Sequence, residues 1–317
     1  MNEERNLTEK TMRKNLISFD DVTKEEMQEI LDITQYIKDK QKRGELYEPL
    51  KKKTLGLIFQ KPSTRTRVSF DAGMFQLGGK AIILNLADLQ LSRGESIEDT
   101  ARVLSRYMDG MVIRGEHRFL AGLAKNSTIP VINGLTEKFH PCQILSDLFT
   151  IKERGMEPKG LKVVFVGDGN NVCQSLMQGA AKFGMNMVFT GPEGYEPDGK
   201  ILKQTVAEAK KNGGSIKIEY DPEKAVREAD VIYTDTWVSM GQEKEEAARV
   251  KAFRLFQVNA KLLKKAKQDC MIMHCLPAHR GQEITSEVLD GKQSVVWDQA
   301  ENRLHTQKAV LMLWLSK

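Results

Sequence analysis

The chain has 317 residues, of which 40% are apolar and 29% charged, a composition typical of a globular protein with two domains. Its 48 basic and 43 acidic side chains leave a net charge of +5, and the short basic runs at 51–53 and 264–265 do not predict a nucleic-acid surface. Four cysteines predict neither a disulfide framework nor a zinc site. Because there is no membrane-spanning apolar run of ~20 residues and no signal-peptide core, we expect a cytoplasmic protein.

The first predicted helix begins at a capping box formed by Thr23 and Glu26. Strand-like and helical patterns then alternate along the first half of the chain. Strands are predicted at 55–59, 81–86, 110–114 and 129–133, with helices between them and a further helix at 140–154. This alternation predicts a parallel sheet with helices on its faces.

The segment after the first of these strands has the sequence Ser-Thr-Arg-Thr-Arg at 63–67. We expect Ser63 to cap a helix whose buried face carries Phe70, Met74 and Leu77. Free N–H groups at the helix start, beside hydroxyls and a guanidinium, suit a small dianion such as phosphate, although the spacing of a P-loop is absent. The alternative is a plain helix cap with solvent-exposed arginines.

Further polar side chains lie at predicted strand ends. Arg114 closes one strand, and His140 and Gln143 follow another. Because ligands collect beyond the carboxyl ends of parallel strands, we expect these side chains to lie near residues 63–67. A lone histidine is more often structural, so it is the neighbouring anion site that favours a functional His140.

A second alternating half begins after a linker at 158–160. Strands are predicted at 161–166, 187–190, 216–220, 231–234 and 271–274, with helices at 172–183, from 202 and at 221–229. The turn at 167–171 invites comparison with a dinucleotide-binding loop. Its glycine pattern lacks the third small residue, and no acidic residue clearly ends the next strand, so a dehydrogenase is a less favoured alternative.

Two segments after strands of this half are candidate substrate contacts. The polar loop at 235–243 contains Gly241 as a pivot, which favours a substrate clamp, and the alternative is a surface turn around a buried Trp237. Cys275 follows the strand at 271–274 and is either a small buried hydrophobic residue or a functional thiol.

Four motifs occur in order along the chain: Ser-Thr-Arg-Thr-Arg at 63–67, His-Pro-Cys-Gln at 140–143, Asp235 with Ser-Met-Gly at 239–241, and His-Cys-Leu-Pro at 274–277. Together they resemble the ornithine carbamoyltransferase family, and the likeness covers essentially the whole chain. The first two motifs resemble what aspartate and ornithine carbamoyltransferases share, and the last two resemble the ornithine branch. Gln60 stands where many members carry Glu, a departure that bears on electrostatics at the helix start.

The resemblance implies an α/β fold of two domains, each a doubly wound parallel sheet flanked by helices, joined by interdomain helices. Residues 1–150 would form a carbamoyl phosphate-binding domain, onto which a C-terminal helix at about 300–317 packs back. Residues 151–299 would form an ornithine-binding, Rossmann-like domain. A homotrimer, or a multiple of it, is also implied, with no cofactor, metal ion, nucleic acid or membrane.

Carried over by position, the resemblance implies the site residues as well. Carbamoyl phosphate would contact Ser63, Thr64, Arg65, Thr66, Arg114, His140, Pro141, Cys142, Gln143, Cys275, Leu276 and Arg303, with Gln90 reaching it from a neighbouring subunit. Ornithine would contact Asn171, Asp235, Ser239 and Met240. The catalytic set would be Arg114, His140, Gln143, Asp235, Cys275 and Arg303.

The implied reaction transfers the carbamoyl group of carbamoyl phosphate to the side-chain amine of L-ornithine, giving L-citrulline and phosphate in arginine metabolism. It needs donors for an oxyanion and for the leaving phosphate, and a group that takes a proton from the amine, which fits the residue types above. Two alternatives are carbamoyl transfer to another amine, such as putrescine or an acylated ornithine, and a catalytically silent binding subunit.

Overall fold

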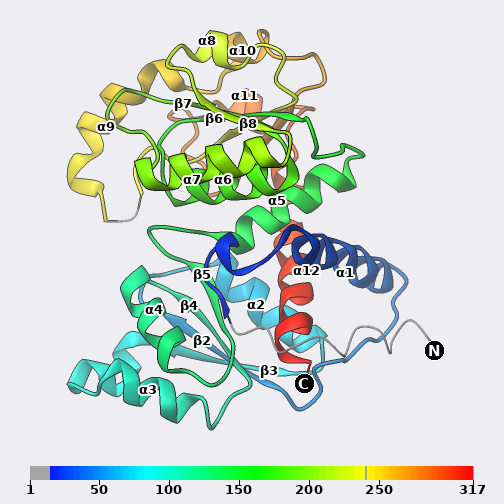
Figure 1. Ribbon diagram of the computed structural model, residues 1–317, viewed down its shortest axis with the longest axis vertical. Helices are drawn as coiled ribbons and strands as arrows, with labels where there is room; N and C mark the ends of the chain where they lie inside the picture. Colours follow the sequence, from blue (N-terminus) through cyan, green and yellow to red (C-terminus); the bar gives the residue numbers. More distant parts are fainter. Residues whose placement is uncertain (1–14, 240, 317) are drawn as a thin grey trace. The chain divides into compact units, whose positions relative to one another are not determined.

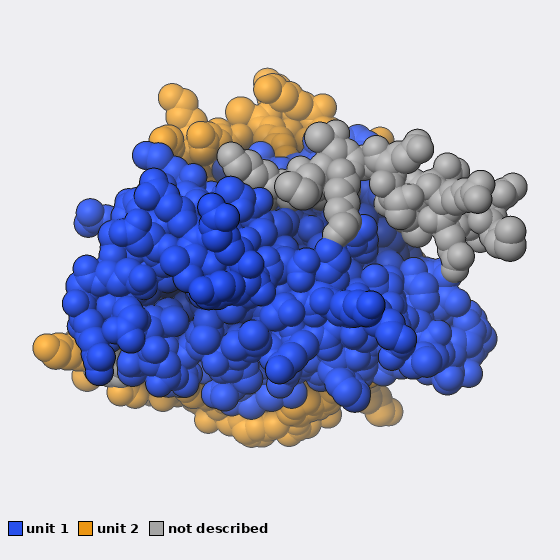
Figure 2. Space-filling model, turned by 90° about the horizontal axis from the view of Figure 1, so that it is seen from below, with its two compact units in different colours: residues 1–145, 303–317 blue, residues 146–302 orange. Residues whose placement is uncertain are grey.

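The computed structural model describes residues 15–239 and 241–316. The chain forms two compact units: unit 1 comprises Met1–Leu145 and Arg303–Lys317, and unit 2 comprises Ser146–Asn302. Figure 2 colours unit 1 blue and unit 2 orange. Both boundaries fall inside helices, α5 (Pro141–Glu153) and α12 (Val296–Leu315), so each of these helices contributes to both units.

Unit 1 contains a parallel sheet with the strand order β1-β5-β4-β2-β3 (Figure 1). The strands are β1 (Asn15–Leu16), β2 (Thr54–Phe59), β3 (Lys80–Asn85), β4 (Gly110–Arg114) and β5 (Val131–Leu135). Successive side chains of a strand point to opposite faces, and all side chains of β2 after Thr54 are buried, so both faces of the sheet are covered. The side chains of edge strand β3 are half-buried or exposed.

The helices of unit 1 are α1 (Lys24–Lys42), α2 (Arg65–Gln76), α3 (Ile97–Leu104) and α4 (His117–Asn126), with parts of α5 and α12 and the short 3-10 helices η2 (Phe19–Asp21), η3 (Leu86–Asp88) and η4 (Gln90–Arg93). The capping box predicted at the start of α1 is confirmed, because the side chains of Thr23 and Glu26 each accept the other's backbone N–H. Apolar side chains of β4 pack against Phe119, Leu120 and Leu123 of α4.

Unit 2 repeats this plan with a parallel sheet in the order β10-β9-β6-β7-β8. Its strands are β6 (Lys162–Val166), β7 (Asn186–Thr190), β8 (Ser215–Ile218), β9 (Val231–Thr234) and β10 (Met271–His274). Its helices are α6 (Asn171–Phe183), α7 (Gly199–Lys211), α8 (Pro222–Ala225), α9 (Glu246–Phe253), α10 (Ala260–Leu263) and α11 (Ser286–Leu289), with 3-10 turns η5 (Glu243–Glu245) and η6 (Arg254–Phe256). The predicted α/β class with two helix-flanked parallel sheets is confirmed.

Some elements differ from the sequence prediction. The helix expected at 221–229 ends at Ala225, and Glu228 adopts a left-handed φ of 54°, which a continuing α-helix does not allow. The two-residue strand β1 and helices α9 and α10 were not predicted, because segments this short carry little periodicity. Among the described helices, none combines the length and apolarity that crossing a bilayer requires.

Candidate active site

Polar side chains of unit 1 gather beyond the carboxyl ends of its central strands. Arg114 is the last residue of β4, and its Nη1 donates to Thr66 Oγ1 in the first turn of α2 at 3.3 Å. We call the set formed by Thr66, Arg114, His140, Gln143 and Arg303 the donor cluster. This arrangement agrees with the expectation that Arg114 and His140 lie near residues 63–67.

Arg303 of α12 lies at the centre of the donor cluster and is 3% exposed. Its Nη1 donates to Gln143 Oε1 at 2.5 Å and lies 3.5 Å from His140 Nε2, and its Nη2 lies 3.3 Å from Thr66 Oγ1. With the Gln307 amide oriented so that its oxygen faces Arg303, that oxygen accepts from Nε and Nη2 at 3.0 and 2.9 Å. A planar guanidinium with five donors is the side chain that can hold so many acceptors in a fixed geometry.

His140 is buried and is neutral in this setting. Burial lowers its pKa well below the usual value, and the nearby guanidinium groups of Arg303, Arg114 and Arg65 lower the pKa further. Because a guanidinium can only donate, His140 Nε2 faces Arg303 as an acceptor, which places the ring proton on Nδ1. The imidazole is therefore a neutral hydrogen-bond donor at Nδ1.

The start of α2 differs from the prediction that Ser63 is its N-cap. The helix begins at Arg65, and Thr64, the N-cap residue, already has a helical backbone and makes no capping hydrogen bond through its side chain. A capping side chain reaches the first-turn N–H groups from an extended backbone, so this geometry leaves them uncapped by that side chain. Such a helix start suits an anion. Beside it lies a pocket of about 850 Å³, lined in part by Lys61, Ser63 and Arg67.

Gln60 has a structural role at the end of β4. Its Oε1 accepts the backbone N–H of Glu116, the N-cap residue of α4, at 2.7 Å. Gly115 makes this close approach feasible, since a Cβ atom there would lie 1.9 Å from Gln60 Oε1. The effect of Gln60 therefore falls at the start of α4, whereas the sequence reasoning placed it at the start of α2.

The remaining predicted residues of unit 1 are more peripheral. Cys142 is buried and donates to the backbone oxygen of Asn133, and burial raises the pKa of its thiol to about 12, so it is not a nucleophile. Pro141 is the first residue of α5, a position that suits proline. Gln90 is exposed in η4, and no side-chain hydrogen bond joins it to the donor cluster within the described residues.

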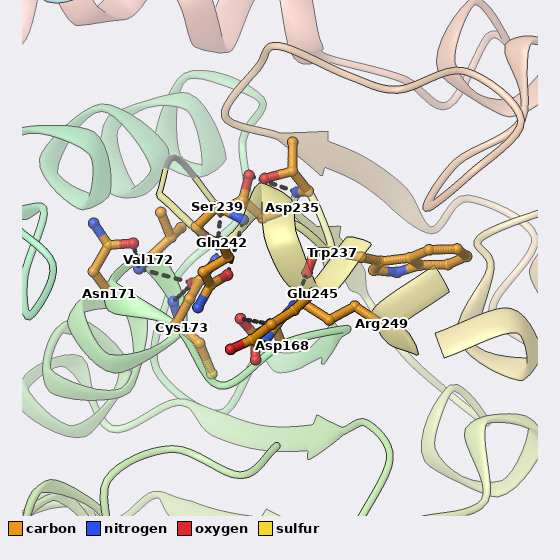
Figure 3. A network of polar contacts seen from close by, with 12 residues as sticks. Asp168, Asn171, Val172, Cys173, Asp235, Trp237, Ser239, Gln242, Glu245 and Arg249 are labelled. Atoms are coloured by element: carbon orange, nitrogen blue, oxygen red, sulfur yellow. Dashed lines mark hydrogen bonds and ion pairs between the residues drawn. The ribbon is translucent and has the colours of Figure 1, made fainter. Parts of the chain in front are cut away.

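Asp235 is an acidic side chain directly after the end of β9 in unit 2 (Figure 3). It follows β9 and is 8% exposed. Oδ1 accepts from the Cys275 thiol at 3.0 Å and from the backbone N–H of Thr236 at 2.8 Å, and Oδ2 accepts from Asn170 Nδ2 at 2.8 Å. The structure thus brings Asp235 and Cys275 together, as predicted. Asn171, the other predicted residue of this turn, is the first residue of α6.

The loop after Asp235 is closed by a reciprocal contact. Ser239 N–H donates to Gln242 Oε1 at 3.0 Å, and Gln242 N–H donates to the backbone oxygen of Ser239 at 3.0 Å. Gly241 has a φ of 97°, a conformation that favours glycine, which agrees with its predicted role as a pivot. Met240 lies outside the described residues. Trp237 is buried, and its ring stacks on Phe253 of α9 with centroids 5.9 Å apart.

A buried ion pair ties this loop to the turn after β6 (Figure 3). Arg249 of α9 donates through Nε to the backbone oxygen of Trp237 at 2.6 Å, and its Nη2 lies 2.5 Å from Asp168 Oδ2. Its guanidinium also lies over the Tyr195 ring at 4.9 Å. The pKa of Asp168 is raised to about 6. Burial is the main cause, Asp235 also raises the pKa, and Arg249 partly offsets both by lowering it. Arg249 therefore connects the loop to the rest of unit 2.

The same region bears on two other kinds of ligand, a metal ion and the dinucleotide of the dehydrogenase alternative. One ligand atom each of Asp235, His274 and Cys275 lie within 4.8 Å of one another, a spacing that could hold a cation. Both ring nitrogens of His274, however, already have protein partners, which a metal would have to displace. At Gly169 a Cβ atom would lie 2.2 Å from the backbone nitrogen of Pro197, so this glycine serves the packing of the chain's own loop against the turn.

Sequence reasoning missed several residues that hold the candidate site. Asn170, Asp168 and Arg249 support Asp235 and its loop, Gln307 contacts Arg303, and Glu283 contacts His274. Asn170 had a usable signal, because two adjacent asparagines at a helix start offer both a cap and a second polar group. Asp168 and Arg249 lie 81 residues apart and had no local signal. Gln307 lies one helical turn from Arg303 on α12, an i,i+4 spacing that could have indicated the contact.

Comparisons with known proteins agree with this arrangement. The carbamoyl-P binding domain of the aspartate/ornithine carbamoyltransferase family matches residues 14–153, and its Asp/Orn binding domain matches residues 159–314. An ornithine carbamoyltransferase of Pyrococcus horikoshii is 56% identical over 303 residues, covering 95% of this chain and 96% of the relative. The anabolic ornithine carbamoyltransferase of Pyrococcus furiosus is 56% identical over 301 residues, with 95% and 96% covered.

Solved structures show the same likeness. The ornithine carbamoyltransferase structure from Pyrococcus furiosus superposes with a TM-score of 0.93 at 55% identity, covering 96% of this chain and 97% of that one. The anabolic ornithine carbamoyltransferase of Campylobacter jejuni subsp. jejuni superposes with a TM-score of 0.89 at 39% identity, covering 95% and 98%.

Proposed function

This chain belongs to the aspartate/ornithine carbamoyltransferase family, and we propose that it transfers the carbamoyl group of carbamoyl phosphate to the side-chain amine of L-ornithine. The products are L-citrulline and phosphate. The observation that carries the proposal is the donor cluster of unit 1, in which two guanidinium groups, a neutral imidazole, an amide and a hydroxyl converge at strand ends.

The phosphate of the donor substrate is assigned to the start of α2. We assign it to Ser63, Thr64, Arg65 and Thr66, which supply hydroxyls, a guanidinium and the N–H groups of the first turn. Support comes from the absence of a capping bond by the Thr64 side chain and from the positive end of the helix dipole. The leaving phosphate is more negatively charged than the phosphoryl group of the bound acyl phosphate, so these donors bind it more strongly as the C–O bond to the carbamoyl carbon breaks.

The carbamoyl group is assigned to Arg114, His140, Gln143 and Arg303. Attack on the carbonyl carbon places negative charge on its oxygen, and cationic and neutral donors fixed in a buried site stabilise that oxyanion without reorganising. His140 suits this role because burial and the nearby arginines hold its pKa well below the usual value, so the neutral ring does not change its charge during the reaction.

Ornithine is assigned to Asn171, Asp235, Ser239 and Met240, with Cys275 beside Asp235. The side-chain amine resembles that of lysine, with a pKa near ~10.4, so making it neutral at pH 7 costs about 4 to 5 kcal/mol. A carboxylate next to the amine receives its ammonium form and can accept a proton as attack occurs. Hydrogen bonds from Asn170, the Thr236 N–H and the Cys275 thiol fix the two oxygens of Asp235, which supports this assignment.

A colorimetric citrulline assay tests the proposal. Ornithine with carbamoyl phosphate should give citrulline, and aspartate, putrescine and N-acetylornithine should give little or no carbamoylated product. Arg65→Ala should lose most turnover while the fold persists, because Arg65 is half-buried at the proposed phosphate site. A preference for putrescine or an acylated ornithine would replace the substrate assignment, and no product with any amine would refute the activity.

We assign a homotrimer, or a multiple of it, as the assembly. Support comes from large apolar side chains that lie exposed on one face of α2, Val68 at 59% and Phe75 at 79%, next to edge strand β3. Such surfaces mark protein interfaces. Light scattering tests the mass. If Gln90 serves a neighbour's site, mixing the inactive variants Gln90→Ala and Arg303→Ala should restore part of the activity.

The biosynthetic direction and a cytoplasmic location belong to the same proposal. The relative from Pyrococcus furiosus is named anabolic, which supports a role in arginine biosynthesis. The cysteines are all free, which suits a reducing compartment. Fractionation of cells that express the tagged full chain tests the location.

A further inference from the structure

A pocket of about 520 Å³ lies in unit 1 where α1, α2 and α12 meet. Figure 1 draws these helices in dark blue, light blue and red. The lining comes from the end of α1, the segment at 44–48, the end of α2 with residues 77–79, and Lys308 of α12. All of these residues belong to unit 1, and none of them is a member of the donor cluster. The pocket is therefore separate from the candidate active site.

Lys308 brings a buried ammonium group to this pocket. The residue is 2% exposed, and its stem crosses α2 at Gly73, where a Cβ atom would lie 3.2 Å from Lys308 Cγ. Its Nζ donates to Gln41 Oε1 of α1 at 2.5 Å and to Gln76 Oε1 of α2 at 3.0 Å. An ammonium group has three N–H donors, so these two amide oxygens leave one donor for a further acceptor.

The charge of Lys308 has no carboxylate partner among the described residues, since both of its acceptors are neutral amides. Glu45, which also lines the pocket, is bound by Lys40 at 2.9 Å and by Arg43 at 2.5 Å. Burial lowers the pKa of Lys308 to about 8, because the ammonium form loses hydration there. Buried charges in proteins are ordinarily paired. An anion entering the pocket would supply the missing partner.

We propose that this pocket binds a small organic monocarboxylate whose carboxylate contacts Lys308 Nζ and whose apolar part packs on Tyr47 and Leu77. Both apolar contacts line the pocket, Tyr47 half-buried and Leu77 1% exposed. A carboxylate would accept the remaining N–H in a charge-assisted hydrogen bond. A single negative charge matches the one uncompensated cation, whereas the carboxylates of Glu45 and Glu48 in the lining disfavour a dianion such as phosphate. The inference does not depend on carbamoyl transfer.

An NMR titration of the full chain with 3-phenylpropionate tests the proposal without measuring turnover. At pH 7 the wild type should bind this probe with a Kd on the order of 1 mM or tighter. Lys308→Met keeps the length of the side chain and removes its charge, and it should weaken binding by about tenfold or more. Lys42→Met, at an exposed position of α1 outside the lining, is the matched control and should bind like wild type.

Two outcomes of this titration would overturn the proposal. One is the absence of saturable binding of 3-phenylpropionate to the wild type. The other is binding to Lys308→Met within twofold of wild type, which would place the probe elsewhere on the protein. Melting temperatures of the variants show whether each is folded, and an apolar replacement of a buried charge is often tolerated.

A second arm needs only the wild type, so it holds even if Lys308→Met does not fold. Lys40, Glu45 and Glu48 are the other charged side chains that line the pocket, and the two α2 residues of the lining are uncharged. The pKa of Glu45 is lowered to about 2 through its bonds with Arg43 and Lys40, and that of Lys40 is raised through its bond with Glu45, so neither group loses its charge between pH 7 and 9.

Lys308 does lose its proton over this range, since its pKa is lowered to about 8. The affinity for 3-phenylpropionate, which stays ionised, should therefore fall about fivefold to tenfold from pH 7 to pH 9. The uncharged analogue 3-phenylpropanol should bind about tenfold more weakly at pH 7 and show no such dependence. A constant affinity for the carboxylate from pH 7 to 9, or equal affinities for the carboxylate and the alcohol, contradicts the ion pair with Lys308.

Discussion

The guanidinium of Arg303 donates a hydrogen bond to Gln143 Oε1 over 2.5 Å, although the two residues are 160 positions apart in the sequence. The same group lies within 3.5 Å of His140 and Thr66, and the Gln307 amide can face its Nε. Arg303 is therefore surrounded by acceptors of unit 1 and fixes their positions relative to one another. Its role as an organiser of the donor cluster adds to its assigned contact with the carbamoyl group.

Replacing Arg303 with lysine should keep the charge and lose the activity. A lysine ammonium has one nitrogen and cannot reproduce the planar fork that bridges several acceptors. We expect kcat/KM for carbamoyl phosphate to fall by about 10²- to 10³-fold, as for the loss of a fixed oxyanion donor. Arg102→Lys on α3, where the arginine side chain is 67% exposed, is the control and should match wild type. Activity of Arg303→Lys within threefold of wild type contradicts the assignment.

Replacing Arg249 should weaken the binding of ornithine and leave the binding of carbamoyl phosphate unchanged. It joins the backbone oxygen of Trp237 to Asp168, so Arg249→Met frees the loop that follows Asp235. The expected result is an increase of about tenfold or more in KM for ornithine, with the dissociation constant of carbamoyl phosphate unchanged by calorimetry. Lys251→Met, at an exposed position of the same helix, is the control. Equal weakening of both substrates would indicate a general loss of structure.

The free energy of unfolding of the wild type, measured relative to that of Asp168→Asn, should fall as the pH rises toward neutrality. Its pKa is raised to about 6, mainly by burial, so between about pH 4 and 6 the folded state binds more protons than the unfolded state. The stability from this group is present below the unfolded pKa and lost as pH rises through 6. Asparagine does not titrate. Between pH 4.5 and 7.5 the wild type should lose on the order of 2 kcal/mol relative to the variant.

Urea unfolding of the wild type and Asp168→Asn at several pH values measures this difference directly. Other titrating groups are common to both proteins and cancel in the comparison. A difference that does not change with pH, or one that grows in favour of the wild type as pH rises, contradicts the raised pKa of Asp168. Retention of an ionised Asp168 at neutral pH despite this loss agrees with its role in holding Arg249.

Local sequence patterns were sufficient to predict the two sheets and the positions at which several of their strands end. The runs at 110–114, 231–234 and 271–274 were placed at their observed bounds, because buried strands of a parallel sheet are continuous apolar runs. The start of α2 was misjudged at Ser63. The helix begins at Arg65 after Thr64, whose backbone is already helical, and such dihedral angles are not visible in the sequence.

Most contacts that hold the candidate site could not be predicted from the sequence, because they join residues at distant positions. Arg249 lies 81 residues from Asp168, and Arg303 lies 237 residues from Thr66. No periodicity or spacing rule links such pairs, whereas motifs at strand ends can be placed once the sheet is predicted. Glu283 was missed for a related reason, since a single glutamate in a loop is ordinarily a surface residue.

Turnover should rise with pH between 6 and 9, and His140 should not be the cause. At subsaturating ornithine the rate should increase about tenfold per pH unit below the pKa of the substrate amine, because only the neutral amine attacks. The pKa of His140 lies well below its usual value through burial and the nearby arginines, so the ring stays neutral over this range. His140→Gln should therefore lower the rate and keep the same slope. A flat or falling wild-type profile argues against direct attack by the amine, and a slope that disappears in His140→Gln identifies the ring as the titrating base.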